Sequence, residues 1–116
     1  MPAINDFEGL NKITRKQKGV YVLWGNNSEC LYVGRGKVLN RLSFHLTPRT
    51  EFNELIVSIT VYICNSDRET SLLEYALIHR YCPIYNRERR WNNIVGLKYK
   101  DWGEKFTLKK VQVKIK

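Results

Sequence analysis

The chain has 116 residues, of which 43% are apolar and 27% are charged. This composition excludes a disordered chain and supplies enough apolar material for one compact core. Lys and Arg number 20 against 11 Asp and Glu, which gives a formal net charge of +9. We therefore expect residues 1–116 to form a single basic domain whose partner is a polyanion.

Two features of the sequence bear on the cellular location of the protein. The longest apolar stretch, residues 55–64, is interrupted by Ser58 and Thr60 and is far shorter than the ~20 residues of a membrane-spanning helix. Residues 1–12 lack the apolar run and the cleavage site of a secretory signal. We therefore expect a cytoplasmic protein with no membrane partner.

The cysteines are widely spaced and form no C-x-x-C pair, which argues against a disulfide framework and against a zinc ribbon. We expect Cys30, Cys64 and Cys82 to be small buried side chains. A zinc-stabilised interaction domain, which would need metal bound by cysteine, stays open as an alternative class.

The first predicted element is a β-hairpin, formed by residues 19–24 and 30–34 around a turn at residues 25–28. A four-residue loop pairs Tyr21 directly with Tyr32 on one face of the hairpin. The opposite face is then wholly apolar, so we expect it to be the core face. Its members are Val20, Val22, Trp24, Leu31 and Val33.

A helix is predicted next, over residues 37–46, because leucines recur there at helical spacing. Arg41 and His45, four residues apart, fall together on a different face from the leucines. Pro48 ends the helix or lies just beyond its end.

The period-two alternation of residues 55–64 predicts the central strand of a sheet. Ser66 and Glu69 have the spacing of a capping box, which predicts a second helix that runs to about Tyr81 and stops before Pro83.

Glu74 is unusual for a purely structural residue of this second helix. None of its neighbours three or four positions away is a cation that could pair with its carboxylate. The side chain either reaches from the edge of the apolar stripe into water or binds a hard cation, which prefers oxygen ligands.

Five ordered elements now resemble the GIY-YIG nuclease family. They are Gly-Val-Tyr at residues 19–21, Tyr-Val-Gly at residues 32–34, Arg41, Glu74 and Asn86. The resemblance implies a small α/β domain in β-β-α-β-α order, with a three-stranded antiparallel sheet flanked by helices. It also implies cleavage of phosphodiester bonds in DNA with one divalent ion, Mg²⁺ or Mn²⁺. We assign this catalytic core to residues 17–87.

The resemblance further implies a role for each matching residue. Tyr21 and Tyr32 correspond to the two motif tyrosines, one of which is proposed in the family to help deprotonate the attacking water. Arg41 corresponds to the arginine that contacts the scissile phosphate, and Glu74 to the single metal-binding carboxylate. Asn86 corresponds to an asparagine that supports the site.

Two residues of the second triplet region complete this set. Gly34 closes the triplet and supports the site, and Arg35 falls where members often carry a basic, phosphate-binding residue. From the residues alone, the tyrosines could instead pack at the edge of the core, and Arg41 could belong to a solvated helix face.

His45 departs from the family pattern, since many members place a tyrosine one helical turn after the arginine. A histidine titrates near neutral pH. We therefore hypothesise that His45 takes the proton from water directly or relays it from Tyr21. The alternative is an ordinary polar helix residue.

Residues 88–116 form a basic C-terminal extension, in which weak strand patterns at 94–99 and 106–115 are compatible with a further hairpin. At its start, Arg87, Arg89 and Arg90 stand beside aromatic and amide residues, which suits contacts to nucleic acid. A solvated charged loop would have the same composition.

The sequence therefore predicts a metal-dependent DNA endonuclease of GIY-YIG type. The alternative is a catalytically weak or inactive nucleic-acid-binding module on the same fold. Because little of the chain is left for target recognition, we also expect a homodimer or a separate specificity partner.

Overall fold

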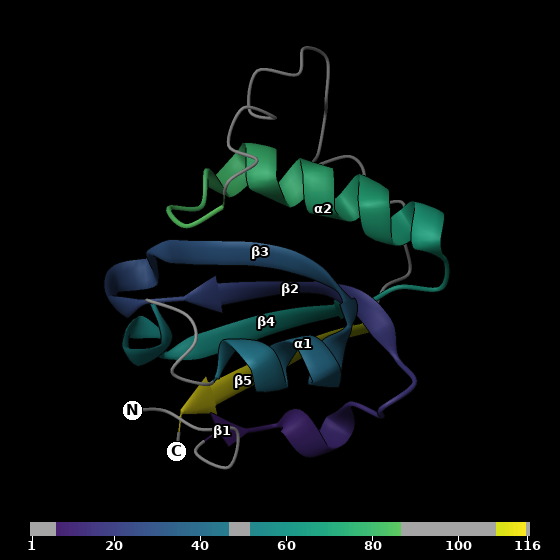
Figure 1. Ribbon diagram of the computed structural model, residues 1–116, viewed down its shortest axis with the longest axis horizontal. Helices are drawn as coiled ribbons and strands as arrows, with labels where there is room; N and C mark the ends of the chain where they lie inside the picture. Colours follow the sequence, from purple (N-terminus) through teal and green to yellow (C-terminus); the bar gives the residue numbers. More distant parts are fainter. Residues whose placement is uncertain (1–6, 47–51, 87–108, 116) are drawn as a thin grey trace.

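The computed structural model describes residues 7–46, 52–86 and 109–115. Its strands form one antiparallel sheet in the order β1-β5-β4-β2-β3, flanked by two helices (Figure 1). The elements, in chain order, are β1 (Phe7–Glu8), η2 (Leu10–Lys12), β2 (Lys18–Trp24), η3 (Asn26–Ser28), β3 (Cys30–Lys37), α1 (Val38–His45), η4 (Asn53–Leu55), β4 (Ser58–Ile63), α2 (Asp67–Tyr81) and β5 (Lys109–Ile115).

The predicted three-stranded sheet is wrong in its size, because the sheet has five strands. The prediction identified β2, β3 and β4, and it correctly placed β4 at the centre. It missed β1, and it grouped β5 with a separate hairpin. Instead β5 lies between β4 and β1 and pairs with both. The other predicted strand, residues 94–99, lies outside the described residues.

The predicted register of the β2–β3 hairpin is wrong by two residues. Tyr21 pairs with Gly34, and Leu23 pairs with Tyr32. The pairing shifts at Leu23 and Trp24, so β3 carries one more residue than a regular ladder would place beside them, and this residue is Leu31. Because a shift of two residues is even, Tyr21 and Tyr32 still lie on the same side, with ring centroids 6.2 Å apart. The bulge, by contrast, places Cys30 and Leu31 on the faces opposite to those predicted.

Apolar side chains cover both faces of the sheet, whereas the prediction assigned the core to one. The face that α1 covers buries Tyr21 and Leu23 with Leu42, and Leu31 joins this cluster rather than the opposite one. The other face buries Val20, Val22 and Val33 under α2. Figure 1 shows α1 in front of the sheet and α2 along its β3 edge. The site described below lies where these two layers meet the edge strand.

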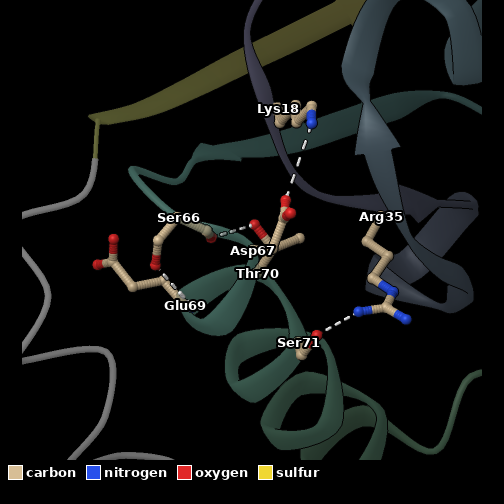
Figure 2. Close-up of polar contacts among 7 residues, drawn as sticks. All are labelled: Lys18, Arg35, Ser66, Asp67, Glu69, Thr70 and Ser71. Carbon is tan, nitrogen blue, oxygen red and sulfur yellow. Dashed lines mark hydrogen bonds and ion pairs between the residues drawn. The ribbon is translucent and has the colours of Figure 1, made fainter.

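The start and end of α2 follow local sequence signals. The Ser66 Oγ accepts a hydrogen bond from the Glu69 backbone N–H at 3.1 Å (Figure 2). The Glu69 carboxylate accepts from the Asn65 N–H, also at 3.1 Å. This is the predicted capping box, displaced by one residue on its return bond. Cys82 ends the helix in the left-handed conformation, with a φ of 47°, just before Pro83.

Two of the three cysteines are buried as predicted, namely Cys30 and Cys64. Cys82 is exposed, because it occupies the C-cap of α2, where the chain leaves the helix. Among the helices of the described residues, none is both long and apolar enough to cross a membrane.

Candidate active site

Tyr21 stands at the centre of the site, in the middle of β2, and is completely buried. Its ring lies across the backbone of the edge strand at Gly34. A Cβ atom at position 34 would overlap the Tyr21 hydroxyl and would lie 2.7 Å from Cε1 of Tyr32. The glycine of the second triplet is therefore required for the tyrosine of the first triplet to reach the strand edge.

The glycine of the first triplet, Gly19, is required for a different reason. A Cβ at Gly19 would overlap the backbone carbonyl oxygen of Tyr62 on β4. Gly19 thus lets β2 pair closely with the central strand directly before Tyr21. Neither contact can be seen in the sequence, because each partner comes from another strand.

His45 lies inside the molecule, although it was predicted with Arg41 on a different helix face from the leucines. Its side chain is only 3% exposed. The last turn of α1 inserts it among aromatic rings, with centroids 4.7 Å from Tyr32, 5.5 Å from Tyr21 and 5.9 Å from Phe52. The His45 Nε2 lies 2.9 Å from the Tyr21 hydroxyl.

Burial sets the protonation of this pair. Desolvation, and secondarily the charge of Arg41, lowers the pKa of His45 to about 4. Desolvation also raises the pKa of Tyr21 above its usual value, with a further contribution from Tyr32. At neutral pH the pair is therefore a phenol and a neutral imidazole. The Tyr21 hydroxyl and the His45 Nε2 share one hydrogen bond, whose donor is set by the tautomer of the imidazole, and the phenol oxygen also accepts from the guanidinium of Arg41, which can only donate.

Arg41 connects the buried pair to the surface. Its guanidinium hydrogen-bonds to Tyr21 and to Tyr32, and the first of these interactions is the main cause of its raised pKa. The Arg41 Cζ also lies 5.6 Å from the centroid of the Phe44 ring. The side chain is exposed, so its positive charge is available to a phosphate while its donors hold both motif tyrosines.

The carboxylate of Glu74 pairs with a cation from a neighbouring strand. Its side chain is 13% exposed, and its Oε1 lies 3.4 Å from the Nε of Arg35 on β3. The Nη1 of Arg35 donates to the Ser71 hydroxyl, one turn earlier on α2 (Figure 2). The Glu74 charge also contributes to the raised pKa of Tyr21, so the carboxylate lies within electrostatic reach of the tyrosines.

The donor set around Glu74 suits a magnesium-like ion. Within the described residues, no group of three or more His, Cys, Asp or Glu could hold a metal ion together. Mg²⁺ characteristically binds one or two carboxylates and completes its shell with water and substrate phosphate oxygens. A single, largely buried carboxylate beside an exposed arginine fits this mode.

Asn86 holds the backbone of the second triplet. Its Oδ1 accepts from the Val33 N–H, and its Nδ2 donates to the Val33 carbonyl, both at 2.8 Å. Asn86 is 4% exposed. The N–H groups of Ile84 and Tyr85 donate to other carbonyls of β3. The segment after α2 thus covers the free edge of β3.

The structure brings most of the predicted site residues together. They are Tyr21, Tyr32, Gly34, Arg35, Arg41, His45, Glu74 and Asn86. Arg87, Arg89 and Arg90 lie outside the described residues. Sequence reasoning missed Phe52, whose ring stacks on Tyr32 at 5.6 Å, and Ser71. An aromatic residue between a helix and a strand was the available signal for Phe52.

Comparison with known proteins also indicates a GIY-YIG domain. The family model described as "UvrC-like GIY-YIG domain" matches residues 17–87. The UvrABC system protein C of Thermosipho africanus is 38% identical over 76 residues, which is 61% of this chain and 14% of that protein. The same protein of Clostridium tetani is 32% identical over 89 residues, or 70% of this chain and 14% of the relative. The chain thus spans a small part of these curated relatives.

Solved structures agree with the sequence relatives. The GIY-YIG N-terminal endonuclease domain of UvrC from Thermotoga maritima, bound to its catalytic divalent cation magnesium, superimposes with a TM-score of 0.56 and 31% identity. The match covers 62% of this chain and 85% of that domain. Since the family model spans more than half of the sequence, this chain belongs to the UvrC-like GIY-YIG domain family.

Proposed function

We propose that the chain is an endonuclease domain that hydrolyses phosphodiester bonds in DNA with one divalent cation, Mg²⁺ or Mn²⁺. The observation that carries the proposal is the position of Arg41, which binds both motif tyrosines within reach of the Glu74 charge. A phosphodiester placed there would meet a cation, a phenol and a metal-binding carboxylate. The related Thermotoga domain, described as an endonuclease with a catalytic divalent cation, supports the same reading.

Glu74 is the residue that would hold the metal ion. A divalent cation would neutralise charge on the phosphate oxygens and help the leaving alkoxide. Arg35 keeps the Glu74 carboxylate oriented through the 3.4 Å contact and is itself fixed by Ser71. Arg41 would supply the guanidinium that contacts the scissile phosphate.

Tyr32 is the candidate best placed to accept a proton from the attacking water. It is partly exposed, whereas Tyr21 and His45 are buried. The guanidinium of Arg41 hydrogen-bonds to it, and a cation stabilises negative charge on a phenol oxygen. We therefore assign His45 to positioning Tyr21 through the 2.9 Å hydrogen bond rather than to taking a proton from water.

The test is cleavage of supercoiled plasmid DNA with Mg²⁺ or Mn²⁺. We expect Glu74→Gln, which keeps the shape of the side chain and removes its charge, to lower the rate by on the order of a hundredfold or more. Asp67→Asn makes the same chemical change on the same helix, at a largely exposed carboxylate, and should retain activity.

The outcomes separate the two functions that the fold allows. Equal cleavage by the wild type and Glu74→Gln would contradict the proposed site. Binding of DNA without cleavage by the wild type would favour the non-catalytic nucleic-acid-binding module.

A further inference from the structure

The face of the sheet that α2 covers is partly exposed at β4 and β5 in the described part of the chain. The helix packs on β3 and β2, and the strand register places Tyr62 beside Lys110 and Thr60 beside Gln112 on the remaining half of this face. Lys110 and Gln112 are exposed. The proposed active site lies at the β3 edge of the sheet, where Arg35 contacts Glu74, and β2 separates that edge from β4 and β5, so this surface is separate from the active site.

Two cations on this surface lie against aromatic rings. The Lys110 Nζ is 5.8 Å from the centroid of the Tyr62 ring, and the Arg80 Cζ is 5.3 Å from that of Tyr81. The charge of Arg80 also acts on Tyr62, so the two cation sites are neighbours. A ring that contacts a Lys or Arg side chain restricts the conformations of that side chain. The side chain then loses less conformational entropy when it binds an anion, which favours binding.

A polar cavity of about 470 Å³ continues the surface toward the β2–β3 turn. Amide and hydroxyl groups line it beside Lys110 and Trp24, and none of its lining residues is acidic. The Trp24 Nε1 donates to the Thr60 hydroxyl, which in turn donates to the Gln112 carbonyl oxygen, both at 3.0 Å. This chain fixes the Gln112 amide so that its N–H₂ group is left to contact a ligand.

We propose that this β5 face, defined by Tyr62, Arg80, Tyr81, Lys110 and Gln112, binds the sugar-phosphate backbone of DNA outside the active site. The inference rests on the proposed function for the identity of its ligand. Cations combined with amide and hydroxyl donors are the groups that contact phosphates and sugars in protein–DNA complexes. The acid-free cavity and the net charge of +9 complement such a polyanion.

The test measures how DNA affinity depends on salt, using a fluorescein-labelled duplex in EDTA and fluorescence anisotropy. Loss of one phosphate contact should make the slope of log K against log salt shallower by about 0.9. We expect Lys110→Gln and Arg80→Gln each to show this change, and Tyr62→Leu to weaken binding by removing the ring under Lys110.

Lys109→Gln is the matched control. Lys109 is adjacent on β5, but it pairs with Ile63 on the other face, and its Nζ donates to the Lys12 carbonyl at 3.3 Å. The control should leave the salt slope unchanged. Far-UV circular dichroism checks that each variant is folded.

Plasmid cleavage with Mg²⁺, run in parallel, separates failure of the inference from failure of the proposed function. If the wild type cuts DNA but Lys110→Gln and Lys109→Gln have equal slopes, the β5 face does not bind DNA, while the nuclease proposal stands. If DNA is bound through Lys110 but never cut, the surface stands and the nuclease proposal fails. A wild type that neither binds nor cuts DNA overturns both.

Discussion

His45 is a titratable side chain enclosed by aromatic rings, and this placement makes folding depend on pH. Its pKa falls from 6.5 to about 4 on folding because the buried imidazolium would lose its hydration. Above pH 6.5 the imidazole is neutral in the folded and the unfolded state alike. Between these two pKa values only the unfolded chain binds the proton, so the free energy of unfolding must fall as the pH falls.

The expected loss of stability from His45 is about 3 kcal/mol between pH 6.5 and pH 4, since each pKa unit is worth about 1.4 kcal/mol. Urea unfolding of the wild type and of His45→Gln across this range measures it. The variant cannot titrate, so its curve should lack this fall, and the difference between the two proteins should narrow at low pH. Parallel curves would mean that His45 is not buried as a neutral group.

The contacts of Glu74 and His45 could not be predicted from the sequence, because their partners lie in other segments of the chain. The sequence indicated that none of the residues three or four positions from Glu74 in its helix is a cation. The partner, Arg35, belongs to a strand 39 positions earlier, and only the packing of α2 on β3 brings the two together. The inward position of His45 was missed for a similar reason, because the aromatic rings that enclose it come from three other segments.

At the scale of elements, Asn86 serves as a one-residue substitute for a neighbouring strand. It satisfies both backbone groups of Val33 on the sheet edge. Replacement by Ala would leave a buried N–H and C=O without these partners, at a cost of about 1–3 kcal/mol for each unsatisfied group. For the two groups together, we expect Asn86→Ala to lower the free energy of unfolding by about 2–6 kcal/mol.

Hydrogen exchange locates this effect. The Val33 amide should exchange much faster in Asn86→Ala than in the wild type, while the Val22 amide, which belongs to the neighbouring strand β2, should keep its protection. Asn26→Ala, at an exposed position of the hairpin turn, serves as the control. Unchanged protection of Val33 would show that the hydrogen bonds to Asn86 do not hold the edge strand.

Local sequence signals predicted most helices and strands, but a β-bulge made the predicted register of the β2–β3 hairpin wrong. β-Branched and aromatic residues around a turn identified β2 and β3, and the period-two pattern identified β4. Ser66 with Glu69 identified the start of α2. Leu31 was assigned to the wrong face because a bulge inserts one residue without a distinct composition. The shared face of Tyr21 and Tyr32 survived this error, since the displacement was an even number of residues.

At the scale of the whole molecule, the position of β5 depends on contacts that no local pattern contains. Its alternating residues indicated a strand. They did not indicate that the strand would return across the chain to pair with β4 and β1, far away in sequence. The pairing follows from burial, because without β5 the central strand would be an edge and would expose Ile59 and Val61 on its α1 side.

This arrangement makes the end of the chain part of the core that supports the site. Val113 is completely buried and pairs with Ile59 on β4. Val113→Ala removes two methyl groups and leaves a small cavity, so we expect the free energy of unfolding to fall by about 2–3 kcal/mol. Lys114→Ala, one residue further on and exposed, should change it by less than about 0.5 kcal/mol. Equal urea midpoints for the two variants would mean that β5 adds little to the fold, and that β2, β3 and β4 hold the tyrosines in place by themselves.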